Sequence, residues 1–327
     1  LTQRELEIQA FEPEPYSEVW ADFGVQSGVY SGRWIDRDWK KNDNPHSRAE
    51  RIWDSALATV IRDRCRGKSG TVTEEKKPVT TIAPLLYDLT SLQREAANRY
   101  GFSAKRTLQL AQECYEKHKV LTYPRTDSRY LPEDYLGKVY GIVGAVAEEN
   151  AEFAPFARDI LDNKRVKPNR RVFDTKKVSD HFAIIPTGKI EKLSGDVQKL
   201  FEMVMARFLA VFFPPAVFED TRRTTLIDHR DGVTDAFLTT GRVLVEPGWQ
   251  AVYGRKAGSS SKEELVSVQD GEQAAVREIE IRNAMTKPPA RYNEATLLAA
   301  MEGAGKLVHD EELAAAMSER GLGTPAT

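Results

Sequence analysis

The order of periodicities along the sequence constrains the fold of this 327-residue chain more than any other feature. Residues 1–82 show the short alternating runs and glycine punctuation of strands and loops, and residues 217–283 return to that pattern. Helical spacing of apolar residues dominates the region between them, and residues after 287 are helical again. A helical block inserted into a β-rich domain explains this order more simply than four separate domains. The sequence therefore predicts an α+β, multidomain fold.

Individual elements follow from the same signals. The apolar spacing over residues 85–96 predicts a helix that Gly101 ends, and Ser103 is positioned to cap a second one. Residues 193–213 form the clearest amphipathic helix, which a pair of prolines ends. Residues 65–77 are polar and turn-rich, so we expect a loop or hinge there. The other expected elements are helices over 132–151, 293–302 and 310–319, and strands over 16–23, 217–228, 234–240, 242–246 and 275–283.

Length and composition indicate a globular protein of more than one domain. The chain is long enough for two domains with room for a third, partial one. Its hydrophobic fraction of 41% and charged fraction of 29% are ordinary for soluble proteins, and no stretch approaches a membrane span. The chain begins at Leu1 without an initiator methionine and stops without a tail, so we expect an excised fragment.

The cysteines and histidines indicate the redox environment of the protein and whether it holds a transition metal. Cys65 and Cys114 lack the spacing of a redox or metal motif, which favours the reducing cytoplasm. The five histidines are scattered, without the close pairs that zinc and copper sites use. We therefore expect no transition metal held by this chain.

Charge is distributed unevenly although the formal net charge is only −2. Residues 163–177 carry seven basic side chains against Asp174 alone, whereas residues 261–280 are predominantly acidic. Such separation leaves one basic surface able to meet a polyanion, although a solvated loop with incidental charge is an equally good interpretation of a single run.

The run LTYPRTDSRYLP, residues 121–132, carries the chemistry that stands out. Pro124 restricts Tyr123 to extended geometry, and Arg125 follows two positions later, close enough to reach the same anionic centre. A phenol attacks only when a nearby cation or base lowers the free energy of its anion. Tyr123 with Arg125 is therefore a candidate nucleophile toward a phosphodiester.

His181 is a second candidate, because Asp180 precedes it and the basic run leads into it. A protonated imidazole near phosphate donates a hydrogen bond to its oxygens. Two other motifs do not match the sites that they suggest. Gly67-Lys68-Ser69 lacks the first glycine of a phosphate-binding loop. Asp36 and Asp38 have the spacing of a metal-binding pair, but their surroundings favour a solvated loop. ATP use is not expected.

Four segments taken together resemble a known family. TYPRTDSRYLP, SDHFAIIPTG, PPARYNEATLLAAMEGAG and GLGTPAT, in that order, are similar to the type IA family of bacterial DNA topoisomerases, and specifically to its topoisomerase III group. The resemblance covers essentially the whole chain and places it after the metal-binding TOPRIM domain of that family.

The resemblance implies an isomerase that cleaves single-stranded DNA through a 5′-phosphotyrosyl intermediate, passes a strand and reseals without ATP. It implies Tyr123 as nucleophile, Arg125 on the scissile phosphate, His181 in the family's H-x-A-I-x-P-T pattern and Asp127 as a supporting partner of His181. It also implies DNA-binding roles for three further residues, Arg291, Thr324 and Thr327. The expected cofactor is Mg²⁺, with ligands in the TOPRIM domain and none in this chain. The expected partner is single-stranded DNA, met by a monomer in the cytoplasm near the nucleoid, with no membrane contact.

The resemblance also implies an arrangement of domains. It assigns residues 1–82 and 188–283 to a β-rich arch, residues 83–187 to an inserted helical domain with Tyr123, and residues 284–327 to the start of a helical strand-binding domain. Without TOPRIM we expect the isolated chain to be inactive. Two other functions stay open from the residues alone: a non-catalytic module that binds single-stranded DNA, and a tyrosine recombinase, which would prefer duplex DNA.

Overall fold

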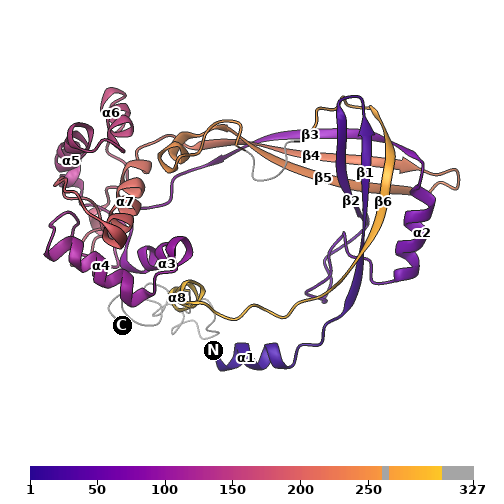
Figure 1. Cartoon of the computed structure of the whole chain (residues 1–327), viewed down its shortest axis with the longest axis horizontal. Coiled ribbons are helices and arrows are strands. Elements are labelled where there is room, and N and C mark those ends of the chain that lie inside the picture. The colour runs from indigo at the N-terminus through magenta and orange to yellow at the C-terminus, as the bar shows by residue number, and fades with distance from the viewer. Residues whose placement is uncertain (260–264, 304–327) are drawn as a thin grey trace. The chain divides into compact units, whose positions relative to one another are not determined.

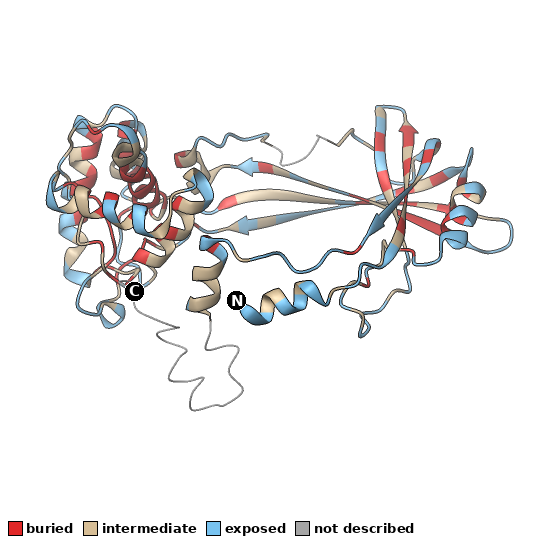
Figure 2. Ribbon diagram, turned by 60° about the horizontal axis from the view of Figure 1, so that its bottom comes forward, coloured by how far each residue is buried: buried red, intermediate tan, exposed pale blue. Residues whose placement is uncertain are grey.

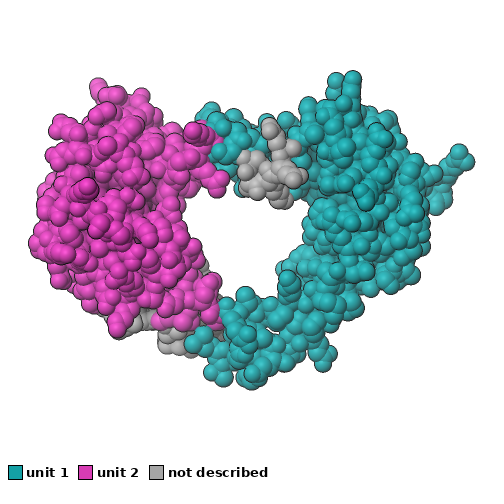
Figure 3. Space-filling view, in the orientation of Figure 1, with its two compact units in different colours: residues 1–80, 217–246, 257–291 teal, residues 81–216, 247–256, 292–327 magenta. Residues whose placement is uncertain are grey.

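A computed structural model describes residues 1–259 and 265–303 of the chain. The chain divides into two compact units, coloured separately in Figure 3. Unit 1 comprises residues 1–80, 217–246 and 257–291, and unit 2 comprises residues 81–216, 247–256 and 292–327. The chain therefore leaves a β-rich unit, forms a helical one and returns, which confirms the expected α+β fold with an inserted helical part.

Six strands in unit 1 close into a barrel (Figure 1). They are β1 (Pro15–Val25), β2 (Gly28–Ile35), β3 (Ser69–Thr81), β4 (Ala216–Asp228), β5 (Thr234–Glu246) and β6 (Gln273–Met285). Their order around the barrel is β1-β2-β5-β4-β3-β6. β1 pairs antiparallel with both β2 and β6, and β4 pairs with β5 along almost its whole length. Two of the pairings that close the barrel are short, because β2 meets β5 over residues 33–35 and β3 meets β6 over residues 69–71.

The barrel core follows from the two-residue period of a strand. Along β1, Val19, Ala21 and Phe23 are buried, while the residues between them are partly exposed. The Phe23 ring packs against Tyr30 and Phe237, with ring centroids 5.5 and 5.3 Å away. Figure 2 shows red, buried stretches interspersed with paler ones along the strands.

Two helices accompany the barrel, α1 (Thr2–Gln9) and α2 (Ser55–Cys65). Asp54 caps α2 by accepting a hydrogen bond from the Ala56 amide at 2.8 Å. Ala58, Ile61 and Cys65 form its buried face, which packs on β1 and β6. The loop expected over residues 65–77 is wrong, because Cys65 ends α2 and β3 begins at Ser69. The polar composition there belongs to a strand that is exposed on both faces over residues 75–78, rather than to a turn.

Unit 2 is built of helices. They are α3 (Leu89–Tyr100), α4 (Ala104–Glu116), α5 (Leu136–Glu149), α6 (Ala154–Asp162), α7 (Gly195–Ala210) and α8 (Glu294–Glu302), with the 3₁₀ turns η1 (Glu133–Tyr135), η2 (Thr175–Lys177) and η3 (Gly248–Tyr253). Ser103 caps α4 by accepting from the Arg106 amide at 3.1 Å, as the sequence predicted. Gly101 ends α3 in the left-handed conformation, with φ 69°. Helix α6 was not predicted.

Helix α7 lies at the centre of unit 2. The expected domain bounds had placed its residues in the β-rich arch. Every residue from Met203 to Ala210 is buried, so the helix is covered on all sides and not on one face alone. Its side chains belong to the same hydrophobic cluster as those of α3, α4 and α5. The expected break at residue 188 therefore differs from the observed units, because residues 188–216 complete the core of unit 2.

Helix α8 packs on α3 within unit 2. Its last residue, Glu302, forms ion pairs with Arg94 at 2.9 Å and Arg129 at 2.6 Å. The expected helix over 310–319 lies outside the described residues. In the described part of the chain, no helix has both the length and the apolar character needed to cross a membrane.

Candidate active site around Tyr123

The two sequence motifs of unit 2 run beside each other. The Thr122 amide donates to the Ile185 carbonyl at 3.0 Å, and the Thr187 amide donates to the Val120 carbonyl at 3.0 Å. These backbone bonds flank Tyr123, so the segment that carries it is fixed to the segment that follows His181. The hydrogen bonds between the two segments explain why residues 58 positions apart in sequence meet at one place.

Two threonine hydroxyls reinforce this pairing. Thr122 donates to the Ala183 carbonyl at 3.1 Å and accepts from the Ile185 amide at 2.9 Å. Thr126 donates to the His181 carbonyl at 2.8 Å. Both hydroxyls satisfy backbone groups that strand pairing alone leaves open. The backbone on each side of Tyr123 and at His181 is therefore rigidly placed.

The Tyr123 ring lies in a small aromatic cluster. Its centroid is 4.2 Å from that of His181, with the planes tilted by 42°, and 5.5 Å from that of Tyr115 in an edge-on arrangement. Tyr123 is partly buried and His181 is exposed. A phenol held beside an exposed imidazole can present both groups to one ligand from solvent.

Arg125 and Asp127 occupy different surroundings on the same segment. Arg125 is partly buried and has neither an ion-pair nor a hydrogen-bond partner among the residues that the structure describes. Its guanidinium therefore keeps its donors for an external anion. The Asp127 carboxylate accepts a hydrogen bond from the Ser179 hydroxyl at 2.6 Å, which ties the tyrosine segment to the residues before His181.

The start of the tyrosine segment is held by charged contacts. The Lys189 ammonium donates to the His118 carbonyl and to the Glu191 carboxylate, both at 2.8 Å, and His118 contacts Glu191 at 2.8 Å through Nδ1. The hydrogen bond from Lys189, and then that from His118, lowers the pKa of the Glu191 carboxyl. Lys119 follows with φ 59°, a left-handed conformation that is uncommon for lysine and that lies four residues before Tyr123.

The basic run of residues 163–177 lies in unit 2 with Tyr123. Some of its cations are used internally: Arg165 pairs with Asp159 at 2.8 Å, and Arg171 donates to the Ala83 carbonyl. The five others are exposed, and of these Lys177 pairs with Asp174 at 3.6 Å: Lys164, Lys167, Arg170, Lys176 and Lys177. The run therefore offers cations to solvent, as a polyanion-binding surface requires.

The three further residues with implied DNA-binding roles are Arg291, Thr324 and Thr327, and of these the structure describes Arg291. Arg291 lies in unit 1, where it forms a two-point ion pair with Glu5 at 2.7 and 3.0 Å. Thr324 and Thr327 lie outside the described residues.

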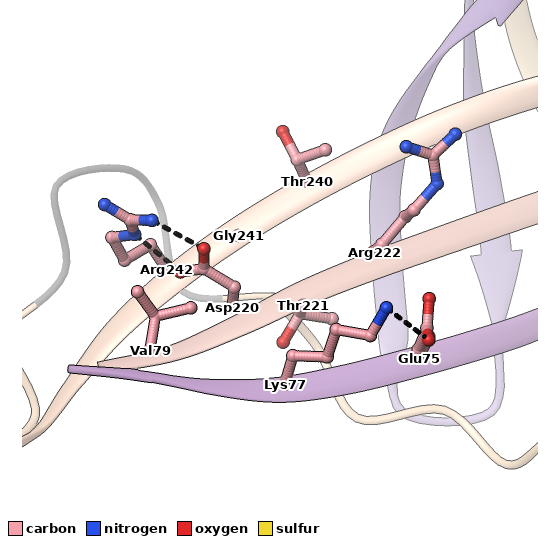
Figure 4. Close-up of a pocket in the computed structure, with 9 residues that line it drawn as sticks. All are labelled: Glu75, Lys77, Val79, Asp220, Thr221, Arg222, Thr240, Gly241 and Arg242. Carbon is pink, nitrogen blue, oxygen red and sulfur yellow. Dashed lines mark hydrogen bonds and ion pairs between the residues drawn. The ribbon is translucent and has the colours of Figure 1, made fainter. Parts of the chain in front are cut away.

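A shallow depression on β3, β4 and β5 of unit 1 is a separate feature (Figure 4). Its volume is about 490 Å³. Its two dashed contacts in Figure 4 are Lys77 with Glu75 at 2.8 Å and Arg242 with Asp220 at 2.5 Å, so most of its charge is neutralised in pairs. The lining offers no arrangement of nucleophile and base.

The surroundings of Tyr123 do not fit Mg²⁺. That ion takes hard oxygen ligands in octahedral geometry, several of them carboxylates or water. Near Tyr123 the described chain places Asp127, which is already bonded to Ser179, and no group of metal-ligating side chains gathers there among the described residues. No chemical step at Tyr123 is therefore assigned to a metal held by this chain.

Sequence reasoning missed the contacts of Tyr115 and Ser179. Tyr115 shares a helical face with Leu108 and Ala111, so its spacing indicated packing rather than contact with Tyr123. Ser179 opens the motif that contains His181, but nothing in the pattern predicted its bond to Asp127. Both contacts depend on how distant segments pair.

Comparison with known proteins decides the family. The whole chain, residues 1–327, matches the family model described as DNA topoisomerase. This chain belongs to that family. It is 37% identical over 341 residues to DNA topoisomerase 3 of Bacillus subtilis (strain 168) and 39% identical over 339 residues to DNA topoisomerase 3 of Bacillus anthracis. Each alignment covers 100% of this chain and 44% of the relative, so the chain spans less than half the length of these DNA topoisomerases.

A solved structure shares the fold of this chain. Full-length topoisomerase I from Thermotoga maritima superposes with a TM-score of 0.64 and 23% identity, covering 99% of this chain and 47% of that one. The expected family, the bacterial type IA DNA topoisomerases with their topoisomerase III group, is therefore confirmed.

Proposed function

We propose that this chain is the strand-cleaving part of a type IA DNA topoisomerase and that Tyr123 is its nucleophile. The observation that carries the proposal is the 4.2 Å contact of the Tyr123 and His181 rings, on segments fixed by hydrogen bonds. Arg125 follows two residues after Tyr123 and has no ion-pair or hydrogen-bond partner within residues 1–259 and 265–303. A phenol in contact with an imidazole, with a guanidinium two residues along the same segment, matches the needs of phosphoryl transfer.

The proposed reaction exchanges one phosphodiester for another. Tyr123 Oη forms a bond to phosphorus of single-stranded DNA while the bond from phosphorus to the 3′ oxygen breaks. The phenol loses its proton and the departing 3′ oxygen gains one, so no proton is consumed overall. The product is a 5′-phosphotyrosyl ester and a free 3′ hydroxyl. Attack of that hydroxyl on the ester reseals the strand, and because the ester conserves the bond energy, ATP is not required.

Arg125 and His181 have the proposed role of stabilising charge on the phosphate. Arg125 donates two hydrogen bonds from one planar group, which suits two phosphate oxygens. A protonated His181 adds a third donor beside the attacking oxygen. Asp127, bonded to Ser179, positions the segment that leads to His181. The exposed cations of residues 164–176 hold the backbone of the strand by their charge, without reading its sequence.

The remaining predictions belong to the whole protein. Mg²⁺ with ligands on a TOPRIM domain, action as a monomer, a cytoplasmic location and inactivity of the isolated chain all stay predictions. The roles of Arg291, Thr324 and Thr327 in the strand groove stay predictions as well.

A covalent-adduct assay tests the proposal. Single-stranded DNA labelled at its 3′ end is incubated with the chain, alone and with a separately produced TOPRIM domain and Mg²⁺, and the mixture is denatured. A 5′-phosphotyrosyl link leaves the label on the protein, whereas a 5′ label marks only a shortened free strand. Tyr123→Phe abolishes the labelled protein, and Tyr115→Phe, which alters a neighbouring phenol, retains it. If no adduct depends on Tyr123, the chain is a non-catalytic module that binds single-stranded DNA.

A further inference from the structure

A cluster of three metal-ligating side chains lies within unit 1, remote in sequence from the tyrosine segment. Cys65 ends α2, His229 lies in the turn between β4 and β5, and Asp235 lies in β5. Their ligand atoms all lie within 4.8 Å of one another. Cys65 is fully buried, Asp235 is 1% exposed, and the His229 side chain is 9% exposed. The barrel brings these side chains together, because β2 pairs with β5 and α2 packs beside them.

The separations of the three atoms suit one bound ion. Cys65 Sγ lies 3.1 Å from Asp235 Oδ2 and 4.0 Å from His229 Nε2, and His229 Nε2 lies 2.9 Å from the same carboxylate oxygen. Tetrahedral ligation by sulfur, nitrogen and oxygen at bond lengths near 2.0–2.3 Å places such atoms roughly 3.3–3.6 Å apart. Each observed separation is within about half an ångström of that range, which side-chain rotation can supply.

More hydrogen-bond donors face the Asp235 carboxylate than it has lone-pair positions to accept from. Oδ2 faces Arg64 Nε at 2.6 Å as well as the cysteine and the histidine, and Oδ1 faces Trp34 Nε1 at 2.8 Å and a second Arg64 nitrogen at 2.5 Å. A carboxylate offers about four lone-pair positions, two on each oxygen. Five donors therefore compete for it, and the cysteine and histidine crowd one oxygen. A cation between the three ligand atoms removes this competition. The cysteine sulfur and the histidine nitrogen then direct lone pairs at the ion and no longer donate to the carboxylate.

We propose that Cys65, His229 and Asp235 form a site for a divalent transition metal of the Zn²⁺ class. Thiolate, imidazole and carboxylate together favour Zn²⁺ over Mg²⁺ or Ca²⁺, which prefer oxygen alone. Binding releases the Cys65 proton to solvent and leaves His229 with its proton on Nδ1. Trp34, on Oδ1, and Arg64, on both oxygens, then orient the ligating carboxylate, as hydrogen-bond donors do at metal sites. Trp34 and Arg64 donate hydrogen bonds to Asp235 and are positioning residues.

The bound ion joins parts of unit 1 that are distant in sequence. It ties the end of α2 to the turn between β4 and β5, where the Val233 carbonyl accepts from the His229 amide at 2.9 Å. The site therefore stabilises the barrel and takes no part in the proposed reaction at Tyr123.

Co²⁺ serves as the probe, because its thiolate complexes absorb in the near ultraviolet and its tetrahedral complexes absorb in the visible. The purified full chain, stripped with a chelator, is titrated with Co²⁺ without DNA, and Zn²⁺ is then added to displace it. We expect one equivalent of Co²⁺ with a thiolate charge-transfer band, and displacement by Zn²⁺. We also expect added Zn²⁺ to raise the thermal unfolding temperature.

Matched variants separate the site from adventitious binding. Cys65→Ser loses the charge-transfer band and weakens binding at least about tenfold, whereas Cys114→Ser, which alters the other buried cysteine, leaves both unchanged. His229→Gln weakens Co²⁺ binding about tenfold but keeps the charge-transfer band. If circular dichroism shows that Cys65→Ser does not fold, the His229→Gln variant alone tests the proposal. Equal spectra and affinities for the wild type and the Cys65 and His229 variants, or no band up to millimolar Co²⁺, overturn the proposal.

Discussion

The Tyr123 and His181 rings lie with their centroids 4.2 Å apart and their planes tilted by 42°. The two rings come from segments that are joined by backbone hydrogen bonds. The fold of the backbone therefore sets the distance between them. The proposed chemistry depends on this relation, because a phosphate that Tyr123 attacks lies within reach of the imidazole.

Replacing His181 with Phe tests the role of the imidazole. The phenyl ring preserves the contact with Tyr123 but cannot donate a hydrogen bond to phosphate. We expect the rate of adduct formation to fall by roughly 10²-fold with the stability of the chain unchanged, as removal of one such donor does elsewhere. Rates are measured with 3′-labelled single strands. His46→Phe in unit 1, where His46 packs on Phe11, is the matched control, and a wild-type rate in His181→Phe contradicts the proposed role.

Replacing Arg125 tests whether its free guanidinium meets the phosphate. Because Arg125 has no partner in the described structure, Arg125→Gln should leave stability nearly unchanged and slow adduct formation by roughly 10²-fold. Arg125→Lys should recover part of the rate, since it restores the charge without the planar pair of donors. Arg129→Gln is the contrast: Arg129 pairs with Asp88 at 2.8 Å, so its loss should lower stability more than the rate.

Thr122 is expected to stabilise the site through its hydroxyl. Thr122→Val keeps the shape of the side chain but leaves the Ile185 amide and the Ala183 carbonyl without this partner. The free energy of unfolding should fall by about 1–3 kcal/mol. Thr73→Val, at an exposed position of β3, should change it by less than about 0.5 kcal/mol. Denaturant unfolding of both variants makes the comparison, and equal effects would contradict the structural role of Thr122.

Cys114 gives unit 2 a predictable response to alkaline pH. Burial raises the pKa of the Cys114 thiol from 9.0 to about 12. The unfolded chain loses this proton near pH 9 while the folded chain keeps it, so the stability present below pH 9 declines as pH rises toward 12.

The measurement for Cys114 is a difference between two proteins. The free energy of unfolding of the wild type should fall relative to that of Cys114→Ser by about 1.4 kcal/mol per pH unit above pH 9. Urea unfolding at pH 8, 10 and 11 gives the slope, and parallel curves for the two proteins would show that the thiol titrates normally in the fold.

The sequence predicted the parts of the fold that local chemistry decides. Ser103 caps a helix, Gly101 ends one, and β4 has almost its expected bounds, because each depends on a few neighbouring residues. The strand β3 was missed, since its polar run has no alternation of buried and exposed residues and the strand depends on its pairing with β4 and β6. Helix α7 was recognised as a helix, but its burial on all sides depends on α3, α4 and α5 packing around it.

In the candidate site, too, the sequence indicated the residues and the structure supplied their contacts. Tyr123, Arg125 and His181 stood out by residue type and order, and the structure adds the contact between the first and the last. The cluster of Cys65, His229 and Asp235 escaped prediction, because 164 positions separate its cysteine from its histidine and only barrel closure joins them.

The site of covalent attachment tests the central claim most directly. After reaction with single-stranded DNA in the presence of a TOPRIM domain and Mg²⁺, the protein is denatured, treated with nuclease and protease, and its peptides are sequenced by mass spectrometry. The proposed mechanism predicts a residual nucleotide on the peptide that contains Tyr123, linked through a 5′ phosphate to that tyrosine alone. A nucleotide on another residue, a 3′-phosphate linkage, or an adduct that persists in Tyr123→Phe would contradict it.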